Sequence, residues 1–283
     1  MKNRLLVLLL AVVAVAGNAR PAQAIAYGEN AADGAYPFSV LLTMTGLPDG
    51  AGGTRDSSCS GALVAERWVI TAGHCFRDGD GRRVDRAVAR RTVAVIGRAD
   101  LRGHDGYEVE VVTVRQADDT DVALAELARP VTGVTPIRLS TGAPHVGEVL
   151  RLTGFGLAVR DGTIGPTDRM QTGRFTVDAV GDTLIEASGA APRPDTSPCP
   201  HDSGGPYFRE LPDGTAELVA VVSGGPGCPH PGPDLGARTD GLADWIAATT
   251  TGRFPAAAAG FGAAGLLVAA TVLTAVLRRR AHR

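Results

Sequence analysis

The sequence predicts an all-β domain placed between two apolar end segments. The chain holds 37 glycines and 18 prolines among 283 residues, a composition that indicates many tight turns. The apolar runs inside the chain are short and rich in Val, Leu and Thr, as is typical of strands. Long helices are expected only at the two ends. The remaining length is enough for one large β domain or two small ones.

The charge balance argues against a nucleic-acid partner. Charged residues make up 20% of the chain and the formal net charge is -2. A nucleic-acid-binding domain normally carries a broad basic surface. We therefore expect no nucleic acid among the partners of this protein.

The N-terminal segment 1–24 has the pattern of a secretory signal peptide. Basic residues at Lys2 and Arg4 precede an apolar run over 5–16, and the segment ends in Ala22-Gln23-Ala24. The alternative is an uncleaved membrane anchor, but the apolar run is short for crossing a bilayer. We expect export and cleavage after Ala24.

The C-terminal segment 255–277 is predicted to form a transmembrane helix. It is uncharged and almost wholly apolar, and an arginine-rich tail over 278–283 follows it. About 20 apolar residues span the hydrocarbon core, and such arginines stay on the cytoplasmic side. A buried or surface helix is the alternative, but an interfacial helix would carry a polar face. We expect a single-pass cell-membrane protein whose domain, 25–248, lies outside and is joined to the helix by a linker, 249–254.

Four cysteines lie between these end segments, and they are Cys59, Cys75, Cys199 and Cys228. An even number in an exported chain favours two disulfides. Zinc binding is the alternative, but no C-x-x-C pair is present. Four cysteines allow three pairings, and the residues alone do not choose among them.

Three segments carry residues suited to nucleophilic catalysis. They are Trp68–Cys75, which contains His74, then Asp121–Leu127, and then Cys199–Pro206, which contains Ser203. A serine hydroxyl needs a base within hydrogen-bond reach, and the base needs a carboxylate that orients it and stabilises its cationic form. Each segment alone has an ordinary structural explanation. Their conjunction predicts a catalytic triad of His74, Asp121 and Ser203.

The choice of carboxylate needs an argument, because Asp118 and Asp119 lie close to Asp121. We prefer Asp121 because it opens the apolar strand pattern of Val122 and Leu124. The other two fit solvated loop charges.

These three segments resemble the trypsin and chymotrypsin family of serine proteases, which has the same His, Asp, Ser order. The resemblance covers roughly residues 25–248. It implies two packed antiparallel β-barrels with the active site between them, and a C-terminal helix around 241–246. It also implies a monomeric endopeptidase that acts on proteins or peptides and needs no cofactor or metal. Trp68 is then expected in the core.

The resemblance also implies the disulfide pairs and the oxyanion hole. The pairs are Cys59 with Cys75 and Cys199 with Cys228. The oxyanion donors are the backbone N–H groups of Ser203 and of the residue two before it, His201. The family has glycine at that second position, where the conformation disfavours a Cβ. His201 therefore raises an alternative function, that of a weak or inactive homologue that only binds peptides.

Further resemblance concerns substrate binding. Ser197 is expected at the base of the specificity pocket, with Gly225 and Gly236 on its walls. Ser223 is expected to begin the segment that pairs with the substrate backbone. No charge is expected in the pocket, which predicts cleavage after large apolar or other uncharged residues.

The resemblance implies one buried ion pair. In this family a new N-terminal amine pairs with the aspartate before the catalytic serine, and here these groups are Ile25 and Asp202. Because the predicted signal cleavage directly precedes Ile25, we expect that signal peptidase itself creates the activating terminus.

Overall fold

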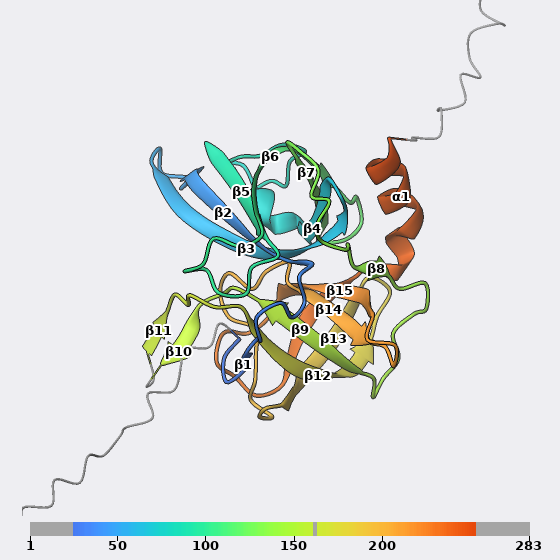
Figure 1. The fold of residues 1–283 in the computed structure, drawn as a ribbon. Helices are drawn as coiled ribbons and strands as arrows, with labels where there is room; N and C mark the ends of the chain where they lie inside the picture. The colour runs from blue at the N-terminus through green and yellow to red at the C-terminus, as the bar shows by residue number, and fades with distance from the viewer. Residues whose placement is uncertain (1–24, 161–162, 253–283) are drawn as a thin grey trace, which may run out of the picture.

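The computed structural model describes residues 25–160 and 163–252, and these form two β-barrels side by side with one short helix, α1 (Figure 1). The first barrel is closed in the order β2-β3-β4-β7-β6-β5. Its strands are β2 Ser39–Pro48, β3 Thr54–Ala65, β4 Trp68–Ala72, β5 Arg91–Ile96, β6 Tyr107–Gln116 and β7 Val122–Leu127. Each pair of neighbours is antiparallel.

The second barrel follows the order β12-β13-β16-β15-β14-β9 and is closed because β9 also pairs with β12. Its strands are β9 Val149–Gly154, β12 Gln171–Val180, β13 Leu184–Ala191, β14 Pro206–Glu210, β15 Ala216–Gly224 and β16 Pro233–Arg238. Short strands border it, namely β1 Glu29–Asn30, β8 Arg138–Leu139 and the separate hairpin of β10 Ala158–Arg160 and β11 Thr163–Gly165. The expected two-barrel fold is confirmed.

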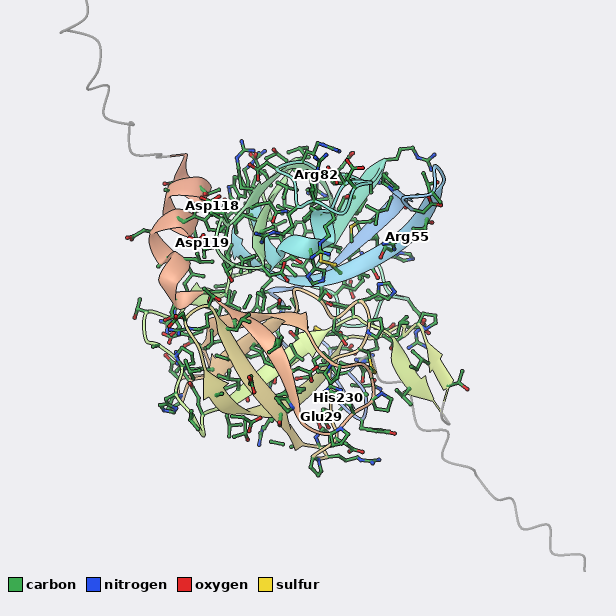
Figure 2. All side chains as sticks on the ribbon, turned by 180° about the vertical axis from the view of Figure 1, so that it is seen from behind. Glu29, Arg55, Arg82, Asp118, Asp119 and His230 are labelled. Atoms are coloured by element: carbon green, nitrogen blue, oxygen red, sulfur yellow. A yellow bond between two sulfur atoms is a disulfide. The ribbon has the colours of Figure 1, made fainter. Side chains whose placement is uncertain are left out.

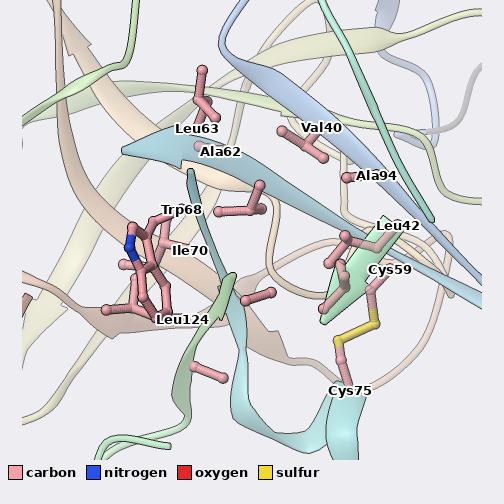
Figure 3. Packing of buried hydrophobic residues seen from close by; sticks show 14 of the residues in the cluster. Val40, Leu42, Cys59, Ala62, Leu63, Trp68, Ile70, Cys75, Ala94 and Leu124 are labelled. Carbon is pink, nitrogen blue, oxygen red and sulfur yellow. A yellow bond between two sulfur atoms is a disulfide. The ribbon is translucent and has the colours of Figure 1, made fainter. Parts of the chain in front are cut away.

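Each barrel is held by its own apolar interior. In the first, Leu42, Ile70 and Leu124 are fully buried, and Trp68 packs in the same cluster (Figure 3). Trp68 is thus a core residue, as expected. The second barrel buries Phe175 and Tyr207, whose rings meet edge to face. Side chains alternate between interior and surface along a strand, so a short apolar or alternating run is enough to form each wall.

Backbone contacts between the barrels position the site. The amide of Ser60 on β3 donates to the carbonyl oxygen of Ser203 at 2.8 Å. Gly204 follows, with φ +81°, and a Cβ there would lie 2.0 Å from Thr71 Oγ1. Only glycine therefore allows the backbone of the second barrel to come this close to the first barrel. The turn that carries Ser203 is fixed against β3 and β4.

The C-terminal helix is longer than expected. A 3-10 turn at Asp240–Leu242 leads into α1, which runs Ala243–Thr251 and ends at Gly252 in the left-handed conformation. Residues 249–251, expected in the linker, therefore continue this helix. Within 25–160 and 163–252, no helix is long and apolar enough to cross a membrane. The signal segment 1–24 and the proposed span 255–277 lie outside the described residues.

Candidate active site

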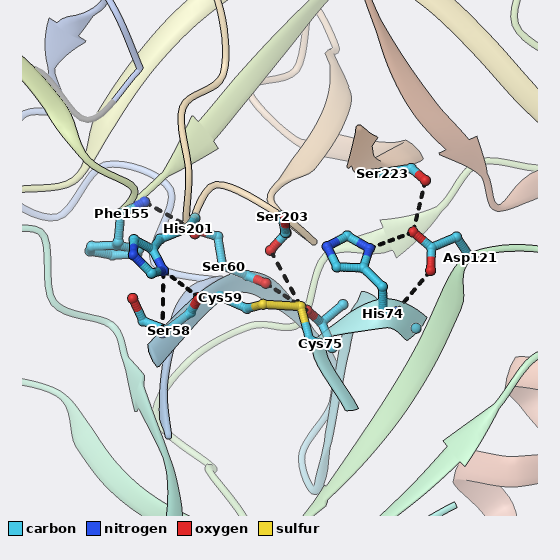
Figure 4. The surroundings of a disulfide bond; sticks show 12 residues. Ser58, Cys59, Ser60, His74, Cys75, Asp121, Phe155, His201, Ser203 and Ser223 are labelled. Atoms are coloured by element: carbon cyan, nitrogen blue, oxygen red, sulfur yellow. Dashed lines mark hydrogen bonds and ion pairs between the residues drawn. A yellow bond between two sulfur atoms is a disulfide. The ribbon is translucent and has the colours of Figure 1, made fainter. Parts of the chain in front are cut away.

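His74 and Asp121 meet at the end of the first barrel. His74 lies in a 3-10 turn, Gly73–Phe76, directly after β4, and Asp121 directly precedes β7. Because β4 and β7 are neighbours, these two ends come together. His74 Nδ1 lies 2.7 Å from Asp121 Oδ2, and the backbone N–H of His74 donates to Asp121 Oδ1 at 2.8 Å (Figure 4). Asp121 thereby fixes both the ring and the turn.

The electrostatics of Asp121 favour its carboxylate form. Burial opposes its ionisation, but the hydrogen bonds and charge of His74 together with a bond from Ser223 hold the pKa of Asp121 below its usual value. Ser223 Oγ donates to Asp121 Oδ2 at 2.8 Å. The sequence analysis assigns Ser223 to the segment that pairs with the substrate backbone and does not predict this contact with Asp121. Asp118 and Asp119 are exposed on the loop before β7 (Figure 2).

Ser203 faces the same cavity as His74. A cavity of about 520 Å³ is lined by both residues and by His201. Figure 4 shows Ser203 beside the His74 ring, next to the Cys59–Cys75 disulfide. No hydrogen bond joins Ser203 to His74 in the described part of the chain. In substrate-free enzymes such bonds are often long and tighten only in the complex.

His201 occupies the glycine position of the oxyanion turn in the glycine-like conformation, with φ +79°. Its ring turns towards β3, where Nδ1 lies 2.8 Å from the carbonyl oxygen of Ser58 and 3.3 Å from its amide nitrogen. The carbonyl of His201 accepts a bond from Ser60 Oγ at 3.1 Å. Among the described residues, the N–H groups of His201 and Ser203 donate to no protein acceptor. Both donors are thus available for an oxyanion.

Asp202 is fully buried behind this turn. Its carboxylate accepts bonds from the N–H of Gly156 at 2.8 Å and of Cys199 at 2.9 Å. Desolvation raises its pKa to about 8 against those two bonds, and the charge of Asp234 adds to the rise. Ile25 is also fully buried, in the apolar cluster inside the second barrel. No hydrogen bond or ion pair between Ile25 and Asp202 occurs within the described ranges, so that pairing stays a prediction.

A smaller cavity of about 190 Å³ opens beside Ser203. Its lining comes from the loop before Ser203, from the end of β15 and from the loop after it, and consists of Pro198, Cys199, Pro200, Ser203, Val222, Gly224, Gly225, Gly227 and Cys228. Gly225 therefore lines this pocket as expected. Ser197 is fully buried, and its hydroxyl accepts a bond from the N–H of His230 at 3.3 Å.

Gly236, expected on a wall of this pocket, is not among the residues that line it. It faces the barrel interior, since a Cβ there would meet the side chains of Ile185 and Ala220. Among the described residues no charged side chain lines this cavity, but the carboxylate of Asp234 lies against Gly225: a Cβ on Gly225 would be 1.9 Å from Asp234 Oδ1. Sequence reasoning missed Asp234 because it is distant from the motifs. An acidic residue beside the apolar and small positions of β16 was the available signal.

The disulfides staple the two catalytic loops. The structure joins Cys59 to Cys75 and Cys199 to Cys228, the pairs that the resemblance implies. The first fixes the turn of His74 to β3, and the second ties the loop before Ser203 to the far wall of the small cavity. Within the described residues, no group of three or more His, Cys, Asp or Glu side chains is placed to hold a metal ion.

Two six-stranded β-barrels with a serine, a histidine and an aspartate at their junction define the class of two-barrel serine hydrolases. The trypsin family model matches residues 25–246, and the chain belongs to this family.

Similar proteins come from several organisms. The chain is 31% identical to a trypsin-like protease of Streptomyces glaucescens over 222 residues, which covers 72% of this chain and 74% of that protein. It is 29% identical to serine protease 56 of Mus musculus over 82% of this chain, but spans only 39% of that protein. It is 28% identical to chymotrypsin-like elastase family member 3B of Homo sapiens, over 88% of this chain and 98% of that protein.

A solved structure shares the fold. Mouse neuropsin, a serine protease, superposes with a TM-score of 0.62 over 80% of this chain and all of the neuropsin chain, at 21% sequence identity. The likeness at this identity shows the fold alone.

Proposed function

We propose that this protein is a serine endopeptidase that cleaves peptide bonds through His74, Asp121 and Ser203. The observation that carries the proposal is the Asp121–His74 pair, held by two hydrogen bonds of 2.7 and 2.8 Å, in a cavity that also exposes Ser203. Family membership supports it. A buried, oriented carboxylate behind a histidine is what a serine nucleophile requires.

The reaction follows from the positions of these groups. Ser203 Oγ attacks the carbonyl carbon of the peptide, and its proton passes to Nε2 of His74. The Asp121 carboxylate stabilises the resulting imidazolium. The N–H groups of His201 and Ser203 bind the oxyanion, and His74 then gives the proton to the leaving amine as the C–N bond breaks. Water repeats these steps on the acyl ester and releases the acid.

The test is chemical labelling combined with substitution. A neutral alkyl fluorophosphonate should modify Ser203, as located by peptide mass spectrometry. Ser203→Ala should abolish both labelling and peptide hydrolysis without lowering thermal stability, and His74→Ala should be comparably severe because nucleophile and base act as one unit. Turnover that survives Ser203→Ala would refute the assignment.

The alternative function is a peptide-binding homologue without catalysis, and His201 is the observation that favours it. A side chain at a glycine position often distorts the turn. Here the ring is held on β3, away from the oxyanion donors, which supports the enzyme instead.

We further propose that the enzyme is exported and held at the outer face of a cell membrane. The sequence 1–24 supports export and the apolar run 255–277 supports the anchor. The family match begins at residue 25, where the mature chain is expected to start. Membrane fractionation with protease protection, compared between the full chain and one ending at residue 254, tests this.

A further inference from the structure

A buried carboxylate without a hydrogen bond from any described residue lies in the second barrel. Asp234, in β16, is 2% exposed, and its Oδ2 is sealed from solvent with no hydrogen bond. No described donor bonds to either oxygen. Desolvation raises the pKa of Asp234 to about 8. A buried charge without compensation is costly, so such a group is uncommon without a partner.

The groups around Asp234 give it no hydrogen bond. His230 Nε2 lies 3.5 Å from Asp234 Oδ2, within ion-pair range, but neither ring nitrogen of His230 has a hydrogen-bond partner among the described residues. The Tyr207 hydroxyl is also buried without a hydrogen bond there, and desolvation followed by the charges of Asp234 and Asp202 raises its pKa. Within the described ranges, His230 is the only basic side chain within 4.0 Å of the Asp234 carboxylate.

The Asp234 carboxylate lies against Gly225, one of the residues that line the small cavity beside Ser203. A Cβ on Gly225 would be 1.9 Å from Asp234 Oδ1. A substrate side chain that enters this cavity past Val222 and Gly225 would therefore approach the carboxylate.

We propose that Asp234 determines primary specificity by binding the cationic end of a lysine or arginine side chain on the acyl side of the cleaved bond. This inference rests on the proposed peptidase function for its substrate, though the binding itself does not need turnover. An ammonium or guanidinium supplies the missing opposite charge and the missing donors. Uncharged side chains leave the carboxylate without a hydrogen-bond donor, and acidic side chains meet repulsion from Asp234.

Asp234 lies at a different position from Ser197, the residue expected at the pocket base. The Ser197 hydroxyl already accepts a hydrogen bond from the N–H of His230. Asp234 lies on β16, which pairs with β15, and its carboxylate lies against Gly225 of the pocket wall. The proposed recognition of a cation therefore does not need a charge at Ser197.

The test compares peptides that differ only at the acyl-side residue, which is lysine, arginine, norleucine or glutamate. Wild type is expected to cleave the lysine or arginine peptide at least about 30-fold more efficiently than the norleucine peptide, from the usual cost of removing one partner of a buried charge pair. Asp234→Asn should remove this preference and still react with the neutral fluorophosphonate. Asp105→Asn is the matched control, because Asp105 is exposed and no side-chain bond to it is described.

Binding measurements separate this inference from the peptidase proposal. Ser203→Ala protein should bind an acetylated tetrapeptide ending in lysine or arginine more tightly than one ending in norleucine, measured by NMR titration, and adding Asp234→Asn should abolish the difference. Equal binding of charged and uncharged peptides would show that His230 satisfies Asp234 internally and would overturn the inference. Failure of fluorophosphonate labelling together with selective binding would instead refute only the peptidase.

Discussion

Substitutions of His201 test whether its side chain stabilises or distorts the turn that carries the oxyanion donors. A residue other than glycine at φ +79° carries a cost of roughly 1–2 kcal/mol. The hydrogen bond from the ring to Ser58 contributes about 1 kcal/mol net and offsets much of that cost. The turn is therefore held by a balance between backbone strain and one side-chain contact.

Substitutions at His201 disturb this balance in different directions. His201→Gly removes both the strain and the bond, and should leave the free energy of unfolding within about 1 kcal/mol and kcat within about threefold. His201→Ala keeps the strain but loses the bond, and should lower kcat about five- to tenfold as the N–H turns away for part of the time. His201→Val should be worse still, because β-branched residues tolerate this conformation poorly.

The assay is steady-state hydrolysis of a chromogenic peptide, with thermal unfolding measured on the same preparations. KM should change little across the series, because the oxyanion donors act mainly in the transition state. His104→Ala, at an exposed histidine, is the control. A gain of 100-fold or more in His201→Gly would show that the native histidine blocks the oxyanion hole, and equal activities of wild type and the Ala variant would show that the Ser58 contact does nothing.

Four further outcomes are expected. Ser223→Ala removes the bond to Asp121, raises the pKa of that carboxyl and should lower kcat about tenfold with little change in KM, and an unchanged kcat would contradict a role in positioning Asp121. One residue added before Ile25 should cripple the exported enzyme because Asp202 loses its proposed amine, and N-terminal sequencing of active wild type must find Ile25 first. The preference for lysine over norleucine should increase from about pH 6 to about pH 9, because Asp234 gives up its proton around pH 8 and only its ionised form pairs with a cation. The pKa of Asp234 is 3.8 in the unfolded chain and about 8 in the folded protein, so between these two pH values the side chain holds its proton only in the folded state. Its contribution to the free energy of unfolding therefore falls as pH rises through this range. The melting temperature of Asp234→Asn should lack this part of the pH dependence.

Much of this protein was determined by local sequence. The pattern of short apolar runs and turns determined an all-β domain, and the segments around His74, Asp121 and Ser203 carried enough chemistry to nominate a triad. A nucleophile, a base and a carboxylate in a known order along the chain are recognisable before their distances are known. The choice of Asp121 over Asp118 followed from strand pattern alone.

Tertiary structure decided the parts that depend on distant residues meeting. The direction of the His201 ring was set by Ser58 on another barrel, and Ser223 met Asp121 across 102 positions in the sequence. The carboxylate of Asp234 lies against Gly225 only because β15 and β16 are paired strands. The order of apolar and polar residues within one segment indicates which face of a strand is buried. The neighbours of a buried charge depend instead on strand order and packing, which bring distant segments together.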